Sequence, residues 1–365
     1  MTELMKDILR QPDELLRLLA YASTAGRPAL ERAARLVGEA EQLYITGIGS
    51  SWHAGIAVQS LLDSGGRPAC LLDASEFLHF TQLAPNSAVV VLSRSGRSIE
   101  IVNLLSKAKQ AGARVVGITN TPESSLAQNA EVTIQLDAHF DHFVSIVMYS
   151  GVALGGGLLA SCVLNQMDGA LVQLLTASLN GVKELLKDWA RRIRDSDWVA
   201  TSTPTYFLAR GSSLASCHEA RLLWEEASKA PATAMTSGGF RHGPQEILVE
   251  GLRVGMWIDG HKMRSQDLAM AADIRKLGGR VMLIGQDLPD SAADLVLCLP
   301  RIQPDWQFLI DIIPVQLAAE HLSHLRGVDC DSLRICSYIV ESETGLIAHQ
   351  TGGQRPTTQP YRATI

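Results

Sequence analysis

The chain has 365 residues, 46% of them hydrophobic and 19% charged, and this composition is typical of a globular protein that is long enough for two domains. Its formal net charge of −6 argues against a nucleic-acid-binding protein, whose contact surface is usually basic. The six cysteines are scattered, with no C-x-x-C pair and no His/Cys cluster, so we expect reduced thiols in a cytoplasmic protein without a metal site.

The N-terminal region is charged and periodic, which is not the pattern of a signal peptide, and we expect a helical segment over residues 1–40. A short apolar strand follows at 43–49, and a helix after it is ended by Gly65 and Gly66. The sequence then predicts a buried strand at 88–92, a helix at 99–111 and a further strand beginning at Ala113. This alternation is typical of a parallel sheet covered by helices on both faces.

The stretch from Phe143 to Met167 has no charged residue and is long enough to cross a bilayer. However, Gly155, Gly156 and Gly157 follow one another inside it, and no flanking positive charges suit a membrane helix. We therefore expect a helix buried inside the protein and no membrane as a partner.

The second half of the chain repeats the first. Residues 205–223 (TYFLARGSSLASCHEARLL) echo residues 42–62, and residues 276–285 (KLGGRVMLIG) echo residues 110–119. The offset is 162 at the Gly-Ser-Ser turns and 166 at the later strand, in the same order along the chain. The repeat predicts two tandem α/β domains of one fold, each a doubly wound parallel sheet.

The predicted organisation has four parts. The helical segment over 1–40 is followed by a first domain over 41–195 and, after a polar break, a second domain over 196–348. The last residues, 349–365, lack periodicity, and we expect a docked or frayed C-terminal tail.

Three serines lie where a buried strand leads into a helix, at Ser93, Ser95 and Ser98. One interpretation is structural, with Ser98 capping the helix that begins at Ile99. The other is a phosphate site, because a helix N-terminus offers free N–H groups and hydroxyl side chains add donors. A second turn, Gly49-Ser50-Ser51, ends the neighbouring strand and favours the phosphate site.

The hydroxyl cluster is present only in the first copy. With an offset of 166 residues, Asp259 aligns with Ser93 and His261 aligns with Ser95. Because an acidic residue repels phosphate, we expect one anion site per chain. The chain has no G-x-x-x-x-G-K-[ST] motif and no dinucleotide fingerprint with its acidic residue, so we expect no nucleotide cofactor. A phosphorylated small molecule remains as the ligand.

On a set of motifs the chain resembles the double sugar-isomerase (SIS) domain family. The motifs are MKDILRQP, GIGSSWHA, LSRSGRSIE, GSSLASCHEARLLWEEAS, GGFRHGP and GVDCDSLR, in family order over roughly residues 5–341. The chain is most similar to the isomerase half of glucosamine-6-phosphate synthase, and to amino-sugar-phosphate deaminase/isomerases and fructosamine-6-phosphate deglycases. The resemblance implies flavodoxin-like domains and a phosphosugar substrate, without a cofactor.

The resemblance also implies roles for individual residues. Glu226 would move a proton between adjacent sugar carbons, and His242 would help to open the sugar ring, reaching the site from the neighbouring subunit of a homodimer. The residues implied to contact the substrate are Ser50, Ser51, Ser93, Arg94 (through its backbone), Ser95 and Ser98 for the phosphate, and Gly49, Val144 and Ser145 near the sugar.

The chain departs from the synthase in three respects. The first 42 residues contain no cysteine and are too few for a glutaminase domain, so we expect no glutaminase activity. The two lysines of the synthase site are replaced by Leu223 and Tyr338. An imine-forming lysine is not needed, however, if the substrate itself carries nitrogen.

The residues themselves allow a proton transfer. Glu219, Leu223 and Glu226 fall on one helical face, and a carboxylate on an apolar face is either a site residue or half of an ion pair. His242 lies in a glycine-rich loop, where a histidine is either merely exposed or a proton donor. With the resemblance, the sequence predicts isomerase, deaminase or deglycase chemistry on a nitrogen-bearing hexose 6-phosphate, through an enediol or enolamine. The alternative is a non-catalytic sugar-phosphate sensor.

Overall fold

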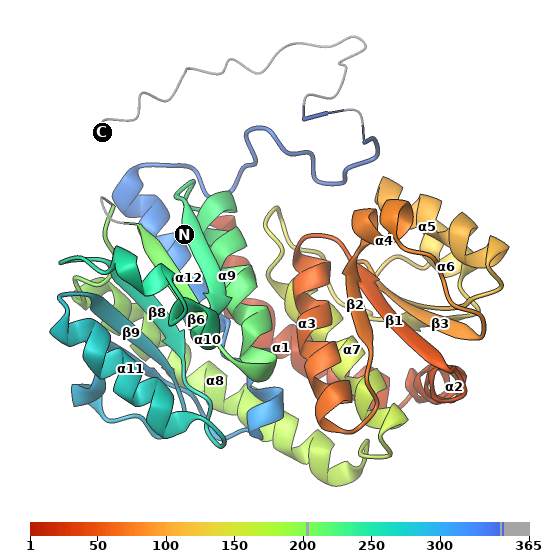
Figure 1. Cartoon of the computed structure of the whole chain (residues 1–365), viewed down its shortest axis with the longest axis horizontal. Coiled ribbons are helices and arrows are strands. Elements are labelled where there is room, and N and C mark those ends of the chain that lie inside the picture. Colours follow the sequence, from red (N-terminus) through yellow and green to blue (C-terminus); the bar gives the residue numbers. More distant parts are fainter. Residues whose placement is uncertain (202–203, 344, 347–365) are drawn as a thin grey trace.

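The structure is a computed structural model, and it describes residues 1–201, 204–343 and 345–346. The C-terminal tail predicted over 349–365 lies outside these residues. Two α/β halves lie side by side, and the segment after the last helix passes over both of them (Figure 1).

The helices and strands follow the expected alternation. In chain order they are α1 (Glu3–Ser23), α2 (Arg27–Gly38), β1 (Gln42–Gly47), α3 (Ser50–Ser64), β2 (Cys70–Asp73), α4 (Ala74–Phe80), β3 (Ser87–Leu92), α5 (Ile99–Gln110), β4 (Arg114–Thr119), α6 (Ser125–Asn129), β5 (Val132–Gln135), α7 (Val147–Val163), α8 (Gly169–Asp195), β6 (Thr205–Ala209), α9 (Leu214–Glu226), β7 (Ala232–Thr236), α10 (Ser237–Phe240), β8 (Arg253–Trp257), α11 (Arg264–Lys276), β9 (Arg280–Gly285), β10 (Leu295–Cys298) and α12 (Ile313–Arg326), with short 3-10 turns at Gly211–Ser213, Pro244–Ile247, Asp290–Ala292 and Pro304–Leu309.

The first sheet has the strand order β2-β1-β3-β4-β5, and all of its pairs are parallel. Its central strand β3 is buried along its whole length. Val89 and Val91 pack into one hydrophobic cluster, whereas Val90 and Leu92 pack into another on the opposite face. A strand buried on both faces explains why this segment is a continuous apolar run.

The second sheet has the order β7-β6-β8-β9-β10, which is the same order when its strands are numbered within their own half. Its pairs are also parallel. The order 2-1-3-4-5 is that of flavodoxin-like folds. The predicted fold class, two tandem doubly wound parallel sheets related by a repeat, is therefore confirmed.

Helix α7 lies within the uncharged stretch that the sequence analysis singled out. Almost all of its residues are buried, and a Cβ on Gly156 would stand 2.4 Å from Val58 of α3. The glycines thus let two helices approach closely. Among the described residues, no helix has the length and apolarity that crossing a membrane requires.

The two halves share one core. The largest hydrophobic cluster contains residues of both halves, such as Ala54 of α3 and Ala220 of α9, and these two helices pack against each other. Because α3 begins at the Gly-Ser-Ser turn and α9 ends at Glu226, this packing brings the predicted phosphate site and the predicted base to the same part of the molecule.

Candidate active site

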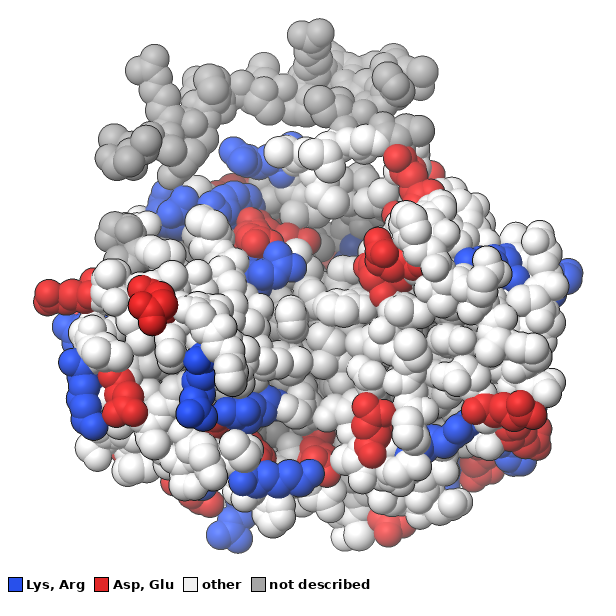
Figure 2. Space-filling model, in the orientation of Figure 1, with Lys and Arg blue, Asp and Glu red and all other residues white. Residues whose placement is uncertain are grey.

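A cavity of about 230 Å³ lies at the carboxyl ends of β1 and β3. It is smaller than most ligand pockets, which begin near about 300 Å³, so it suits a small ligand. In Figure 2 a hollow separates the two halves below the C-terminal segment, with charged side chains of both signs around it. The residues lining the cavity are Ile48, Gly49, Ser50, Ser51, Ser93, Arg94, Ser95, Ser98, Glu100, Phe143, Ser145, Leu222, Glu226, Leu333, Cys336, Ser337, Tyr338, Ile339 and Val340.

Two serine hydroxyls in the loop after β3 are oriented so that they can donate to a ligand. Ser93 Oγ accepts the Gly96 N–H at 3.0 Å, and Ser95 Oγ accepts the Arg97 N–H at 3.3 Å. Each hydroxyl is thereby oriented by its own loop while its proton stays available to a ligand. Gly96 is required here, because its φ is +60° and a Cβ would stand 2.3 Å from Ser124 Oγ.

Ser98 is at the N-cap position of α5, but within the described chain its side chain accepts no N–H of the helix. The capping role that the sequence allowed is therefore wrong for this structure. The first helical N–H, of Ile99, instead donates to the Val340 carbonyl at 3.1 Å. The Ser98 hydroxyl lines the cavity at the positive end of a helix of 12 residues.

The turn after β1 brings a second helix N-terminus to the cavity. Gly49 is the N-cap of α3 with φ +55°, and no side chain in the described chain caps this helix. Ser51 lines the cavity from the first turn of α3. Two helix N-termini, each with serine hydroxyls, thus meet in one cavity, as anion binding requires.

Ser50 differs from the other serines. Its hydroxyl donates to Glu219 Oε1 at 2.9 Å, and Glu219 Oε2 lies 2.7 Å from His53 Nδ1. The Glu219 side chain is 1% exposed. Burial raises the pKa of Glu219 to about 8 and lowers the pKa of His53 to about 3, so both groups favour their neutral forms. Glu219 does not line the cavity.

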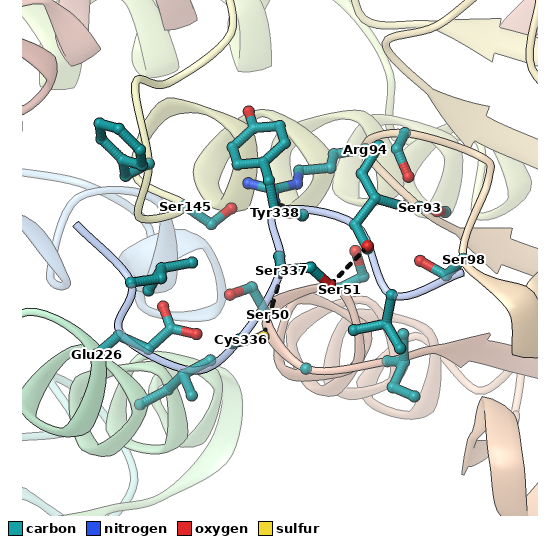
Figure 3. A pocket seen from close by; sticks show the side chains of 18 of the residues that line it. Ser50, Ser51, Ser93, Arg94, Ser98, Ser145, Glu226, Cys336, Ser337 and Tyr338 are labelled. Atoms are coloured by element: carbon teal, nitrogen blue, oxygen red, sulfur yellow. Dashed lines mark hydrogen bonds between the residues drawn. The ribbon is translucent and has the colours of Figure 1, made fainter. Parts of the chain in front are cut away.

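Glu226 does line the cavity, two turns after Glu219 on α9. Burial raises the pKa of Glu226 to about 7, and the neighbouring Glu219 carboxyl adds to the rise. In Figure 3 the Glu226 carboxyl faces the serines across the cavity. A carboxyl with a pKa near neutrality can both take up and give back a proton.

Two of the predicted site residues do not reach this cavity. His242 is exposed, in the turn after α10, and does not line it. Val144 is 3% exposed and packs into the core, whereas its neighbour Ser145 faces the cavity. The structure therefore brings together Gly49, Ser50, Ser51, Ser93, Arg94, Ser95, Ser98, Ser145 and Glu226, and leaves Val144 and His242 outside.

Arg94 contributes its side chain as well as its backbone. Its carbonyl accepts the Asn120 N–H at 3.1 Å, which fixes the loop. Its guanidinium donates to the Tyr338 carbonyl at 2.8 Å and lies 4.2 Å from the centre of the Tyr338 ring. Figure 3 shows the guanidinium behind the tyrosine ring, on the side of Ser145. Arg94 is thus the cation at the wall of the cavity.

The C-terminal segment forms one wall, which the sequence analysis assigned only in part. Cys336, Ser337 and Tyr338 line the cavity, and so does Val340. Lys229 anchors the segment, since its Nζ donates to the carbonyls of Glu226 at 2.7 Å and Ser332 at 2.8 Å. Tyr338 stands where the resemblance aligns the synthase lysine, and among the described lining residues there is no lysine.

The second half repeats the turn after the first strand of its sheet, but the loop after β8, which corresponds to the Ser93 loop, contains its own anion. Gly211 has φ +55°, as Gly49 does. Asp259, however, accepts the N–H groups of Lys262 at 2.7 Å and Met263 at 2.8 Å. The carboxylate occupies the donors that a phosphate would need, which is a physical reason to expect a single anion site. Among the described residues, no three His, Cys, Asp or Glu side chains form a group that could hold a metal.

Comparison with known proteins finds a family model that matches much of the first half. Residues 37–154 match the family model described as SIS domain. Over 346 residues the chain is 24% identical to glutamine–fructose-6-phosphate aminotransferase (isomerizing) of Pyrococcus horikoshii, covering 91% of this chain and 56% of the relative. The chain thus spans little more than half the length of that relative.

Solved structures share the fold of about nine-tenths of the chain. The C-terminal domain of glucosamine-fructose-6-phosphate aminotransferase from Francisella tularensis is similar with a TM-score of 0.80 and 21% identity, covering 91% of this chain and 98% of that one. Glucosamine-6-phosphate deaminase from Thermotoga maritima is similar with a TM-score of 0.76 and 18% identity, covering 93% of this chain and 99% of that one.

Proposed function

We propose that this chain is an enzyme that acts on a phosphorylated sugar in the cavity between its two halves, since residues 37–154 match the SIS domain model. One observation carries the proposal: two helix N-termini with serine hydroxyls face a half-buried carboxyl, Glu226, across a small cavity. The first feature suits a phosphate dianion, and the second suits proton transfer.

The phosphate would be held at the ends of β1 and β3. Ser93, Ser95 and Ser98 would donate from the loop before α5, and Ser51 from the first turn of α3. Hydrogen bonds to a charged acceptor are about twice as strong as neutral ones. The sugar would then extend toward Glu226 and Ser145.

Glu226 would act as the base. As an ionised carboxylate it would take the proton from a sugar carbon next to a carbonyl or imine, leaving an enediol or enolamine, and it would return the proton to the adjacent carbon. Its pKa of about 7 suits both steps. A carboxyl with an ordinary pKa would be a weaker base.

The substrate that we propose carries nitrogen. No lysine lines the described cavity, so the chain offers no amine of its own for an imine. In a fructosamine 6-phosphate, transfer of the proton from C1 to C2 converts the ketosamine to an imine at C1. Water then hydrolyses this imine to release an aldose phosphate and the amine. Deamination or isomerisation of an amino sugar phosphate would use the same proton transfer.

His242 would supply the acid for ring opening from a neighbouring subunit. The residue is exposed and outside the cavity of its own chain, as expected for a group that serves another copy. We therefore propose a homodimer with a shared site. The absence of glutaminase chemistry and a cytoplasmic location remain predictions from the sequence. The second is consistent with the six cysteines, none of which forms a disulfide.

The experiment is a turnover assay with fructosamine 6-phosphates and glucosamine 6-phosphate, comparing the wild type with Glu226→Gln. We expect amine or isomer release by the wild type and a loss of about 100-fold or more in the variant. Full activity of Glu226→Gln would refute the role of Glu226. Tight binding of these sugars without turnover would favour the non-catalytic sensor instead.

A further inference from the structure

Three side chains connect the two halves beside the cavity. Ser50 and His53 are on the first turn of α3, and Glu219 is on α9. His53 is 3% exposed, so its contact with Glu219 is shut off from water. Ser50 alone of the three also lines the cavity.

The hydrogen bond runs from Ser50 to Glu219 when the carboxyl is ionised or carries its proton on Oε2. Glu219 Oε2 faces His53 Nδ1 at 2.7 Å, and in these states the proton between the two groups lies on that side of the carboxyl. Glu219 Oε1 then has only lone pairs to offer, and the Ser50 hydroxyl must donate to it, at 2.9 Å. The raised pKa of Glu219 favours a neutral carboxyl, and with its proton on Oε2 that carboxyl donates to Nδ1. A proton on Oε1, with His53 protonated at Nδ1, would reverse the hydrogen bond to Ser50, and the binding test on Ser50→Ala distinguishes the two forms.

A serine hydroxyl has one proton and two lone pairs. Because the proton of Ser50 is used by Glu219, only lone pairs remain for a ligand. A phosphate oxygen is itself an acceptor, whereas a sugar hydroxyl can donate. Ser93 and Ser95 have the opposite polarity, since each accepts from its own loop and keeps its proton free.

We infer that the buried Glu219–His53 pair is a positioning pair that commits Ser50 to accept a hydrogen bond from a hydroxyl group of the sugar, rather than to bind its phosphate. The inference rests on the proposed function and divides its serines into two classes. Ser93, Ser95 and Ser98 bind the phosphate, and Ser50 selects a substrate that carries a hydroxyl beside it.

The test compares two ligands by isothermal titration calorimetry, inorganic phosphate and glucose 6-phosphate. Ser50→Ala is expected to weaken the binding of glucose 6-phosphate about three- to tenfold, the effect of losing one neutral hydrogen bond, and to leave inorganic phosphate unchanged. Ser98→Ala is the matched control and is expected to weaken both ligands. If Ser50→Ala weakens both ligands equally, the inference is wrong.

The pair itself is tested by Glu219→Gln and Glu219→Ala. A glutamine amide accepts from Ser50 and donates to His53 Nδ1 as the neutral carboxyl does, so this conservative variant is expected to restore the affinity for glucose 6-phosphate that the alanine variant loses. Equal losses in both variants would overturn the positioning role. Should Glu219→Ala fail to fold, the comparison of Ser50→Ala with Glu219→Gln still decides.

The outcomes separate the inference from the proposed function. If the wild type binds neither ligand, the proposed function fails. The wild type could also bind glucose 6-phosphate no more tightly than inorganic phosphate, or only Ser98→Ala could change the affinities. Either result would support the phosphate site and refute the inference about Ser50.

Discussion

The pH dependence of turnover gives a direct test of Glu226. The base must be ionised to accept a proton, and its pKa is about 7 because of burial and the nearby Glu219. At pH 5.5 only about 3% of such a carboxyl is ionised, whereas about nine-tenths of a carboxyl with the ordinary glutamate pKa would be. We therefore expect kcat/KM, which reports the ionisation of the free enzyme, to fall at least about 30-fold from its plateau to pH 5.5.

The assay measures kcat/KM for fructosamine 6-phosphate or glucosamine 6-phosphate between pH 5 and 9. The phosphate of the free substrate has a pKa near about 6, and its own protonation lowers kcat/KM by about a further fourfold at pH 5.5. Glu225→Gln is the matched control: Glu225 is exposed, next to Glu226, and pairs with Arg221. We expect this control variant to show the same fall in activity below about pH 7 as the wild type. A kcat/KM that falls only about fourfold by pH 5.5, as the substrate phosphate alone predicts, would refute the assignment of Glu226 as the base.

Three further predictions follow from other parts of the structure. Ser95→Ala combined with Ser98→Ala should weaken hexose 6-phosphate binding by about 100-fold or more in calorimetry, since two charge-assisted hydrogen bonds are lost; unchanged affinity would contradict the phosphate site. Mixing inactive Glu226→Gln and His242→Ala chains should restore up to about a quarter of the wild-type rate if the site is shared in a dimer, and no recovery would argue against sharing. Glu219→Gln should raise the melting temperature more at pH 9 than at pH 5. The pKa of Glu219 is higher in the folded than in the unfolded protein, so ionisation of the wild-type carboxyl lowers the free energy of unfolding as pH rises toward about 8, and glutamine does not ionise.

The sequence predicted the strands that are buried on both faces. β3 and β4 are continuous apolar runs between turns, so their position follows from hydrophobicity alone. β2 and β7 lie at the edges of their sheets, and their residues are mostly half-buried. Such strands have no strong apolar pattern, and the sequence analysis did not predict them.

The site was predictable where it depends on local sequence. The serines of the two turns precede helices, and that context points to anion binding without further information. The role of Ser98 depended on geometry, because an N-cap serine and a ligand-binding serine have the same sequence context. Tyr338 reaches the cavity only through contacts far along the chain, with Arg94 and through the anchor at Lys229. No local pattern encodes these contacts.

The carboxylate of Asp259 gives the two halves different thermodynamic characters. In the second half, the Asp259 carboxylate accepts the N–H groups of Lys262 and Met263 in the loop before α11. The corresponding loop before α5 holds serines in place of that carboxylate, and an external dianion would supply the acceptor. Substrate would consequently slow amide exchange around α3 and α5 more than around α11, whose preceding loop already contains its own acceptor.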